Sequence, residues 1–167
     1  QPITTTVVLN FMRLKEIKIH QFLPLSLDEA WDFFSSPYNL DEITPADMCF
    51  EILSDVKDKK MYEGMVIQCK IRPILNIPLD WVTEITHVKE KSHFVDEQRF
   101  GPYAFWHHEH HFKAMEGGVK IEDILHYSAP LGLLGKIAEV LYGDNKVKQI
   151  FEYRYQKLNE LFPIKEN

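Results

Sequence analysis

Residues 101–112 read GPYAFWHHEHHF and contain four of the eight histidines of the chain. Imidazole and carboxylate groups this close together could bind a metal, transfer protons or line a binding pocket. The zinc-protease motif HExxH needs a second histidine four residues after the first, but Phe112 occupies that position after His108. The chemistry of the segment therefore depends on which of its side chains share a face.

A glycine–proline turn followed by aromatic residues predicts that residues 103–114 form a β-strand. Alternate side chains of a strand point to the same face. One face then carries Trp106, His108, His110 and Phe112. The other face carries His107, Glu109 and His111. We expect the first face to be the inner one, because apolar residues stand at both of its ends, and the second to face solvent.

The next segment, residues 112–121 (FKAMEGGVKI), predicts a hairpin with a two-residue loop at either 116–117 or 117–118. In both registers the inner face continues on the following strand, where it carries Ile121, Asp123, Leu125 and Tyr127. Asp123 then lies opposite either His110 or Phe112. The pattern therefore predicts a mostly apolar inner wall, with one carboxylate beside one or two imidazoles.

The hairpin that precedes residues 103–114 has two possible registers. A three-residue loop places Asp96 opposite His108. It also places Gln98 opposite Trp106. A two-residue loop would instead turn inward Val95, Glu97 and Arg99. Spacing alone leaves both registers open.

The elements that would position these side chains follow from periodicity and turn residues. Alternating patterns between short polar turns predict strands at residues 14–25, 49–56, 64–74, 79–88, 92–100, 103–114 and 119–128. Ser26 and Glu29 form the pattern of a capping box at the start of a helix that ends at Pro37. A second short helix is predicted over residues 38–43. One long helix is predicted over residues 131–162, because apolar residues recur there every three or four positions.

This order of elements predicts an α+β domain over residues 15–162, with about seven antiparallel strands in a curved sheet wrapped around the long C-terminal helix. Such an arrangement favours a cavity between the sheet and the helix. Residues 1–14 are predicted to be a peripheral N-terminal extension, and residues 163–167 a C-terminal tail.

Composition narrows the classes of function. The net charge of -6 argues against nucleic acid as a partner, because phosphate binding needs a basic surface. No apolar run reaches the length of about 18 residues expected of a membrane span. The two cysteines, Cys49 and Cys69, form no CxxC pair, which favours free thiols in a reducing compartment such as the cytoplasm.

Four stretches carry a resemblance to a known group, namely PLSLDEAWDFFSSPYNLDEITP, FVDEQRFGPYAFWHHEHHF, IEDILHYSAPLGLLG and IFEYR. With them, the chain resembles the START-like (SRPBCC) superfamily, whose fold is the Bet v 1-like helix grip. It is most similar to a bacterial subgroup of ligand-binding proteins of uncharacterised function. Some members of that subgroup are fused to an epimerase-like domain labelled as a cell-division inhibitor.

The resemblance implies a helix-grip fold in which two short helices follow the first strand. The recurring positions of the subgroup correspond here to Asp96, Gln98, Gly101, Pro102, Trp106, His108, His110, Phe112, Asp123, Tyr127 and Arg154. These positions favour the register that places Asp96 and Gln98 inside. Members of the superfamily bind lipids, carry hormones or cyclise polyketides, so the resemblance implies no single function.

We expect the cavity to bind a small, largely apolar ligand of lipid-like or polyketide-like character. The residues predicted to line it are Trp81, Asp96, Gln98, Trp106, His108, His110, Phe112, Asp123, Leu125 and Tyr127. The aromatic and aliphatic members would form the walls, and the polar members would orient a polar group. A purely structural alternative is that the histidines only hydrogen-bond the buried aspartates.

An enzymatic alternative is a cyclase, dehydratase or hydrolase in which His108 or His110 acts as the general base, tuned by Asp96 or Asp123. A metal site built from His108, His110 and Asp123 is a third interpretation, because a His-x-His pair on one strand face can chelate zinc or iron. No motif guarantees that these ligands converge, so we predict no metal and no cofactor. The expected partner is a small apolar molecule, without stable membrane insertion.

Overall fold

A computed structural model describes residues 14–40, 42–45, 51–72, 77–129 and 143–164. In chain order its elements are β1 (Lys15–Leu23), α1 (Leu27–Phe34), the 3-10 helix η1 (Pro37–Leu40), β2 (Glu51–Ile52), β3 (Val66–Ile71), β4 (Leu79–Lys89), β5 (His93–Phe100), β6 (Phe105–Met115), β7 (Gly118–Ser128) and α3 (Asp144–Leu161). No helix among these residues is long and apolar enough to cross a membrane.

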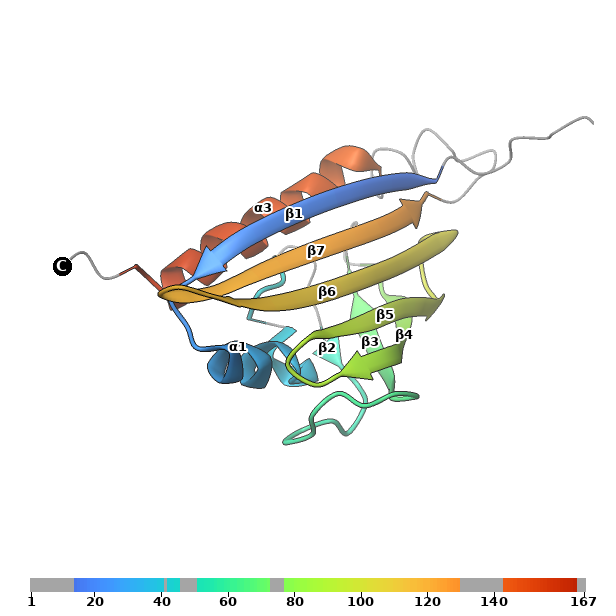
Figure 1. The fold of residues 1–167 in the computed structure, drawn as a ribbon. Coiled ribbons are helices and arrows are strands. Elements are labelled where there is room, and N and C mark those ends of the chain that lie inside the picture. Colours follow the sequence, from blue (N-terminus) through green and yellow to red (C-terminus); the bar gives the residue numbers. More distant parts are fainter. Residues whose placement is uncertain (1–13, 41, 46–50, 73–76, 130–142, 165–167) are drawn as a thin grey trace, which may run out of the picture.

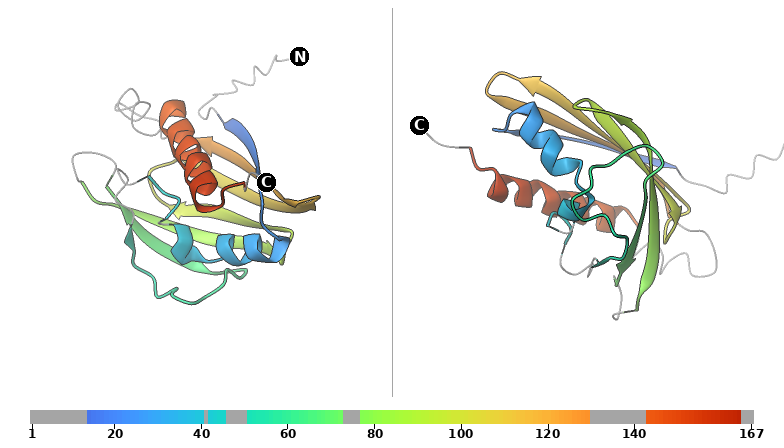
Figure 2. Two further views of the ribbon diagram at one scale, coloured as in Figure 1. Left: turned by 90° about the vertical axis from the view of Figure 1, so that its left-hand side faces the viewer. Right: turned by 90° about the horizontal axis from the view of Figure 1, so that it is seen from below.

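The strands form one antiparallel sheet in the order β1-β7-β6-β5-β4-β3-β2. Strands β2 to β7 follow one another as a meander, and β1 pairs with β7 at the edge. The sheet is curved, and α3 runs lengthwise beside β1 and β7 (Figure 1). Helices α1 and α3 lie on the same side of the sheet (Figure 2). The predicted α+β layout, with a curved sheet and a long C-terminal helix, is confirmed.

The β6–β7 hairpin turns through residues 116–117 and places His110 opposite Asp123. Gly117 has a φ of 77°, in the left-handed region that glycine adopts without steric cost. This is the first of the two registers predicted from the sequence. Because side chains alternate along a strand, it also fixes the inner face of both strands.

The β5–β6 hairpin places Asp96 opposite His108, which is the register favoured by the resemblance. The pairing between β5 and β6 ends at residue 97. The predicted pairing of Gln98 with Trp106 is therefore wrong. The Gln98 side chain instead accepts a hydrogen bond from the Tyr103 backbone nitrogen at 3.2 Å and donates one to the Tyr103 carbonyl at 2.7 Å. Gln98 therefore closes the loop between the two strands.

Several predicted boundaries are wrong. The strand predicted over 49–56 has its described part at Glu51–Ile52, because the hydroxyl of Ser54 accepts the hydrogen bond of the Gln68 backbone nitrogen. The helix predicted over 38–43 is a 3-10 helix over Pro37–Leu40. The described helix α3 begins at Asp144 rather than at residue 131, and residues 130–142 lie outside the described residues. The predicted extension lies almost wholly outside them, as does the end of the tail.

Helix α1 begins with the predicted capping box. The Ser26 hydroxyl accepts a hydrogen bond from the Glu29 backbone nitrogen at 3.2 Å, and the Glu29 carboxylate accepts one from the Ser26 backbone nitrogen at 2.8 Å. Below it, the Trp31 ring packs edge-on against Phe112 on β6, with centroids 5.5 Å apart. The cap and this buried aromatic contact hold α1 across one end of the sheet.

The core has two apolar clusters. The larger one lies under α1 and includes Trp31, Phe34, Phe94 and Phe112. The smaller one lies under α3 and comprises the buried residues Tyr103, Leu125, Tyr127, Val147 and Phe151. The polar side chains of β5, β6 and β7 meet between these clusters, where apolar packing shields them from water.

Candidate functional site

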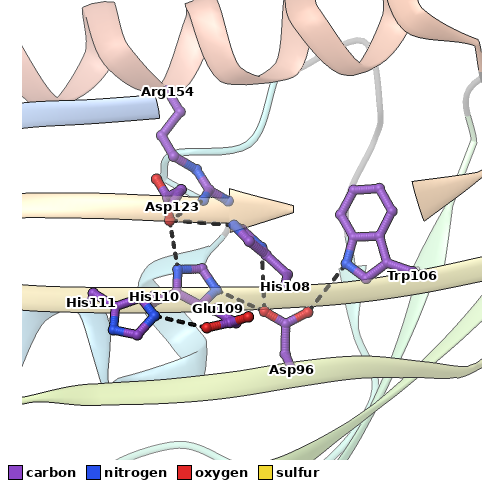
Figure 3. A network of polar contacts seen from close by, with 8 residues as sticks. All are labelled: Asp96, Trp106, His108, Glu109, His110, His111, Asp123 and Arg154. Atoms are coloured by element: carbon purple, nitrogen blue, oxygen red, sulfur yellow. Dashed lines mark hydrogen bonds and ion pairs between the residues drawn. The ribbon is translucent and has the colours of Figure 1, made fainter. Parts of the chain in front are cut away.

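Four polar side chains meet on the inner face of the sheet, and we call them the Asp–His cluster: Asp96 from β5, His108 and His110 from β6, and Asp123 from β7. The two hairpin registers bring them together, since one sets Asp96 against His108 and the other sets His110 against Asp123. Figure 3 shows Arg154 of α3 extending toward this cluster, which lies on the strands facing the helix.

Each imidazole lies between the two carboxylates. His110 Nε2 is 2.7 Å from Asp96 Oδ2 and His110 Nδ1 is 2.9 Å from Asp123 Oδ1. His108 Nδ1 is 3.4 Å from Asp96 Oδ2 and His108 Nε2 is 3.3 Å from Asp123 Oδ1. Trp106 Nε1 donates to Asp96 Oδ1 at 3.3 Å. The carboxylates therefore fix the orientation of both rings.

Both imidazoles are buried, with 4% of each side chain exposed. The His110 ring stacks on Phe94 with centroids 4.2 Å apart, and the His108 ring meets Phe151 edge-on at 5.5 Å. The cluster is thus packed against an aromatic ring of each apolar core. Burial among these rings lowers the local dielectric constant, which strengthens the electrostatic interactions inside.

The protonation states follow from burial and from the neighbouring charges. Burial alone would raise the pKa of Asp96 and of Asp123, but the two imidazoles outweigh it and hold the pKa of each carboxyl well below its ordinary range. Burial would lower the pKa of His108, whereas the Asp96 charge and the Asp123 contact raise it above its ordinary value. The two carboxyls therefore stay ionised to lower pH, and His108 keeps its proton to higher pH, than the same groups do in water.

Arg154, which lies on α3, is a cationic neighbour of the Asp–His cluster. Its side chain is 12% exposed, and its Nη1 lies 3.9 Å from Asp123 Oδ1, an ion-pair distance too long for a hydrogen bond. The guanidinium carbon lies 5.4 Å from the centroid of the Phe151 ring. Within the described part of the chain, Arg154 Nε and Nη1 have no hydrogen-bond acceptor.

Some atoms of the cluster also lack aligned partners. The contacts to Asp123 are short but poorly directed, so the described residues supply no hydrogen-bond partner for His108 Nε2, His110 Nδ1 or Asp123 Oδ1. Buried polar atoms without partners are uncommon and costly, at about 1–3 kcal/mol each. Their concentration at one place marks it as a candidate binding site.

A cavity of about 120 Å³ adjoins the cluster, between the sheet and α3. Its described lining is Thr44, Met61, Ile67, Cys69, Ile71, Trp81, Thr83, Ile85, Phe94, Asp96, Trp106, His108, His110, Ile150 and Arg154. Most of these side chains are apolar, and the ionisable ones other than Cys69 gather where the Asp–His cluster meets Arg154. The cavity therefore has apolar walls and one polar end.

No family model matches the chain, and no curated protein matches it in sequence. Solved structures do resemble it. A crystal structure of a Chromobacterium violaceum protein covers 90% of this chain and 98% of its own at 11% identity, with a TM-score of 0.67. The Panax ginseng major latex-like protein 151 covers 90% and 99% at 11% identity, with a TM-score of 0.63. Ara h 8.0201 covers 89% and 97% at 15% identity, with a TM-score of 0.59.

This chain has the Bet v 1-like helix-grip fold. The fold implied by the resemblance is therefore confirmed. The cavity of this helix-grip chain is bounded by β3, β4, β5, β6 and α3, the elements that carry most of its lining residues.

The structure divides the predicted lining residues into two groups. Those that border the cavity of the helix grip are Trp81, Asp96, Trp106, His108 and His110. Phe112 packs under α1 in the larger core, and Leu125 and Tyr127 belong to the smaller core. Gln98 closes the loop at Tyr103. Asp123 contacts the cavity residues His108 and His110 without bordering the cavity itself.

Strands β3 and β4 supply six cavity residues, of which the sequence prediction included only Trp81. They alternate along each strand, as Ile67, Cys69 and Ile71 on β3 and Trp81, Thr83 and Ile85 on β4. The period of two was visible in the sequence, but only Trp81 was selected from it. Cys69 is a free, buried thiol whose pKa is raised to about 12 by burial.

A metal could in principle use three of these residues. One ligand atom each from Asp96, His108 and His110 lies within 4.8 Å of the others. Two ligands of a tetrahedral zinc at about 2.0–2.1 Å from the metal would stand roughly 3.3 Å apart. His110 Nε2 and Asp96 Oδ2 are 2.7 Å apart, which is a hydrogen-bond distance. The arrangement thus suits a shared proton better than a shared metal.

The opposite face of β6 carries ion pairs at the sheet surface. His107 Nδ1 lies 2.8 Å from Glu97 Oε1, and His111 Nε2 lies 2.8 Å from Glu109 Oε2. The predicted division of the histidines between the two faces is therefore confirmed. The outer set does not border the cavity.

Proposed function

We propose that this protein binds a small, largely apolar ligand in the cavity between the sheet and α3. The observation that carries the proposal is the lining of this cavity, which is mostly apolar with a buried ionic cluster at one end. Ligand sites commonly combine apolar walls with a few convergent polar groups. The superfamily resemblance, whose members include lipid binders and polyketide cyclases, supports the same function.

The size of the cavity favours a ligand at the small end of this class. Pockets for drug-sized ligands enclose about 300–1,000 Å³, whereas this cavity holds about 120 Å³. An apolar cavity of roughly 150 Å³ admits benzene. The ligand would therefore be about one ring or a short chain in size, and a longer lipid would require the cavity to expand.

A titration with toluene followed by NMR tests the proposal. Saturable shifts of the methyl groups of Ile67, Ile85 and Ile150 are expected, because these residues line the cavity. Cys69→Phe should abolish the shifts by filling the space. Cys69→Val, a change of similar shape, should retain them. The proposal fails if toluene leaves the wild-type spectrum unchanged, or if Cys69→Phe binds as well as the wild type.

Native mass spectrometry of gently purified protein complements this test, since a retained ligand would appear as a mass above that of the chain. The mass would distinguish a one-ring ligand from a longer lipid. Cys69→Phe, purified in parallel, serves as the control and should lose the additional mass.

The enzymatic alternative is a cyclase, dehydratase or hydrolase that uses His108 or His110 as general base. The Asp–His contacts favour it, because a carboxylate on one nitrogen orients an imidazole for proton transfer. The raised pKa of His108 argues against this residue as the base, because it favours the protonated form, which donates rather than accepts a proton. Turnover of a candidate substrate that survives both His108→Gln and His110→Gln would rule out the assignment.

We further propose that the site acts without a metal or cofactor, and that nucleic acid is not a partner. The hydrogen-bond distance inside the cluster and the net charge of -6 support these two points. A cytoplasmic location is proposed because a reducing compartment suits the free, buried thiol of Cys69.

A further inference from the structure

We propose that the ligand is a small organic acid, whose carboxylate is received by the guanidinium of Arg154 beside His108 while its apolar part fills the cavity. This inference rests on the proposed function and adds the chemical class of the ligand. It is argued from the unsatisfied donors of Arg154, the contacts that occupy Asp123, and the size and lining of the cavity.

The first argument is the state of Arg154. A guanidinium is always charged and can only donate hydrogen bonds. The Arg154 side chain is 12% exposed, yet its Nε and Nη1 meet no acceptor among the described residues. Leaving such donors unsatisfied in a buried place is costly. An oxygen of a bound molecule would satisfy them.

The second argument concerns Asp123, the carboxylate nearest to Arg154 among the described contacts. It stands 3.9 Å from Arg154 Nη1 but 2.9 Å from His110 Nδ1 and 3.3 Å from His108 Nε2. Asp123 thus faces the imidazoles more closely than the guanidinium. Figure 3 shows Arg154 extending from α3 toward Asp123 and His108. Arg154 and His108 both border the cavity.

The third argument is the placement of the charges. The carboxylates of Asp96 and Asp123 lie against the imidazoles of β6, and Asp96 also accepts a hydrogen bond from Trp106 Nε1. Arg154 borders the cavity, whereas Asp123 does not. The end of the cavity therefore offers the positive charge of Arg154, with its unused Nε and Nη1 donors, to a ligand.

A carboxylate fits this end better than a single neutral oxygen. The planar guanidinium has two edges that match the two oxygens of a carboxylate, Nε with Nη2 and Nη1 with Nη2, and each edge of Arg154 includes one of its unsatisfied donors. Hydrogen bonds between charged partners are roughly twice as strong as those between neutral ones. The apolar walls, which include Ile85, Trp81 and Ile150, would then enclose a single ring or a short chain.

Benzoate and toluene are matched probes for this inference, because they share the ring and differ by the carboxylate. NMR titrations at neutral pH would measure both on the wild type, on Arg154→Met and on Arg99→Met. Arg99 is a suitable control because it pairs with Glu84 and Glu97, which do not border the cavity. Arg154→Met should weaken benzoate roughly 10–100-fold, the loss of a charge-assisted contact. It should leave toluene within about twofold, since no hydrogen bond to toluene is lost.

Two further measurements do not depend on the Arg154→Met variant. In the wild type, benzoate should shift the side-chain Nε–H resonance of Arg154, and toluene should not. Arg154→Lys should lose at least about fivefold in benzoate affinity, because a lysine keeps the charge without the fork. These readouts remain decisive if Arg154→Met does not fold.

The outcomes separate the two proposals. If toluene does not bind the wild type, the proposed function fails and the acid inference falls with it. If toluene binds but benzoate does not, only the acid inference is overturned. The same holds if benzoate binds equally well to the wild type, Arg154→Met and Arg154→Lys, or leaves the Arg154 resonance unmoved.

Discussion

His108 and His110 project from the same face of β6 with their ring centroids 3.8 Å apart, and both rings stand between Asp96 and Asp123. Two imidazolium ions at this distance would repel each other by about 4 kcal/mol at the effective dielectric constant typical of proteins. Arg154 already offsets one of the two carboxylates. Repulsion between the rings opposes protonation of both, while the Asp96 charge and the Asp123 contact raise the pKa of His108.

The raised pKa of His108 predicts how stability changes with pH. In the unfolded chain a histidine has a pKa of about 6.5. Above that pH the folded protein still binds the His108 proton while the unfolded chain has lost it. The free energy of unfolding should fall by about 1.4 kcal/mol per pH unit until the folded pKa is passed. Below about pH 6.5 the full contribution is present.

Urea unfolding between about pH 6 and pH 9 would measure this slope for the wild type and for His108→Gln. In His108→Gln, the free energy of unfolding should no longer show the part of the decline at alkaline pH that His108 causes. This holds whatever the absolute stability of the variant. His107→Gln on the outer face is the matched control and should keep the decline. Equal slopes for the wild type and His108→Gln would contradict the assigned protonation.

The aspartates predict the opposite behaviour on the acid side. Their pKa values are lowered in the folded state, so their contribution is present above the unfolded pKa of about 3.9. It is lost as the pH falls through the lower folded values. Asp123→Asn should therefore flatten the decline in stability below about pH 4.

At neutral pH, Asp123→Asn should cost about 3–5 kcal/mol, because it removes the carboxylate that the Arg154 guanidinium shares with the two imidazoles. Glu97→Gln is the matched control, since Glu97 pairs with Arg99 and His107 on the outer face. An exposed ion pair contributes about 0–1 kcal/mol. Urea unfolding of the two variants checks the contrast, and equal losses would show that the cluster is not energetically distinct.

The sequence predicted which side chains of β6 and β7 share the inner face, because the period of two assigns them to faces and both hairpin registers that were left open give the same assignment. The structure decides between those registers with the turn through residues 116–117. A slip by one residue would have turned His108 and His110 outward. The β5–β6 register was left open by spacing, and the resemblance resolved it in favour of Asp96 inside.

The sequence could not predict which inner residues border the cavity and which are core. That division depends on where the helices pack. Trp31 of α1 covers Phe112, and the Tyr127 hydroxyl donates to Asp144 at the start of α3 at 2.6 Å. Both residues share the inner face of the histidines, but helices distant in the sequence cover them. The position of the helices likewise decides that residues of β3 and β4 border the cavity.

Because Phe112 lies in the core and Trp106 borders the cavity, substitutions at these two positions should differ in their effects on stability and on toluene affinity. Phe112→Leu should destabilise the protein by about 1–3 kcal/mol and leave toluene affinity nearly unchanged, because Phe112 belongs to the packed core. Trp106→Leu should weaken toluene binding, since the indole borders the cavity. Thermal unfolding and the NMR titration together would check this contrast. A large loss of affinity in Phe112→Leu would show that the larger core is part of the binding site.

A metal-free cluster predicts the result of a cobalt titration. Tetrahedral Co²⁺ bound by imidazole and carboxylate would give visible absorption, and we expect none at about equimolar metal, because His110 and Asp96 stand too close to share an ion. Added Zn²⁺ should likewise leave the unfolding temperature unchanged, since a ligand that does not bind cannot stabilise. A cobalt spectrum that disappears in His110→Gln, while persisting in His111→Gln, would overturn the proposal.

The thiol of Cys69 reports on the enclosure of the cavity. At about pH 8 a thiol with an ordinary pKa of about 8.5 is roughly one-quarter thiolate, whereas the pKa of Cys69 is raised to about 12. Because only the thiolate reacts, alkylation by iodoacetamide should be at least about a thousandfold slower than in the unfolded chain. A Cys49→Ser background leaves Cys69 as the single thiol. Mass spectrometry of timed samples, native and in urea, measures both rates, and a difference below about tenfold would mean that the thiol is open to water.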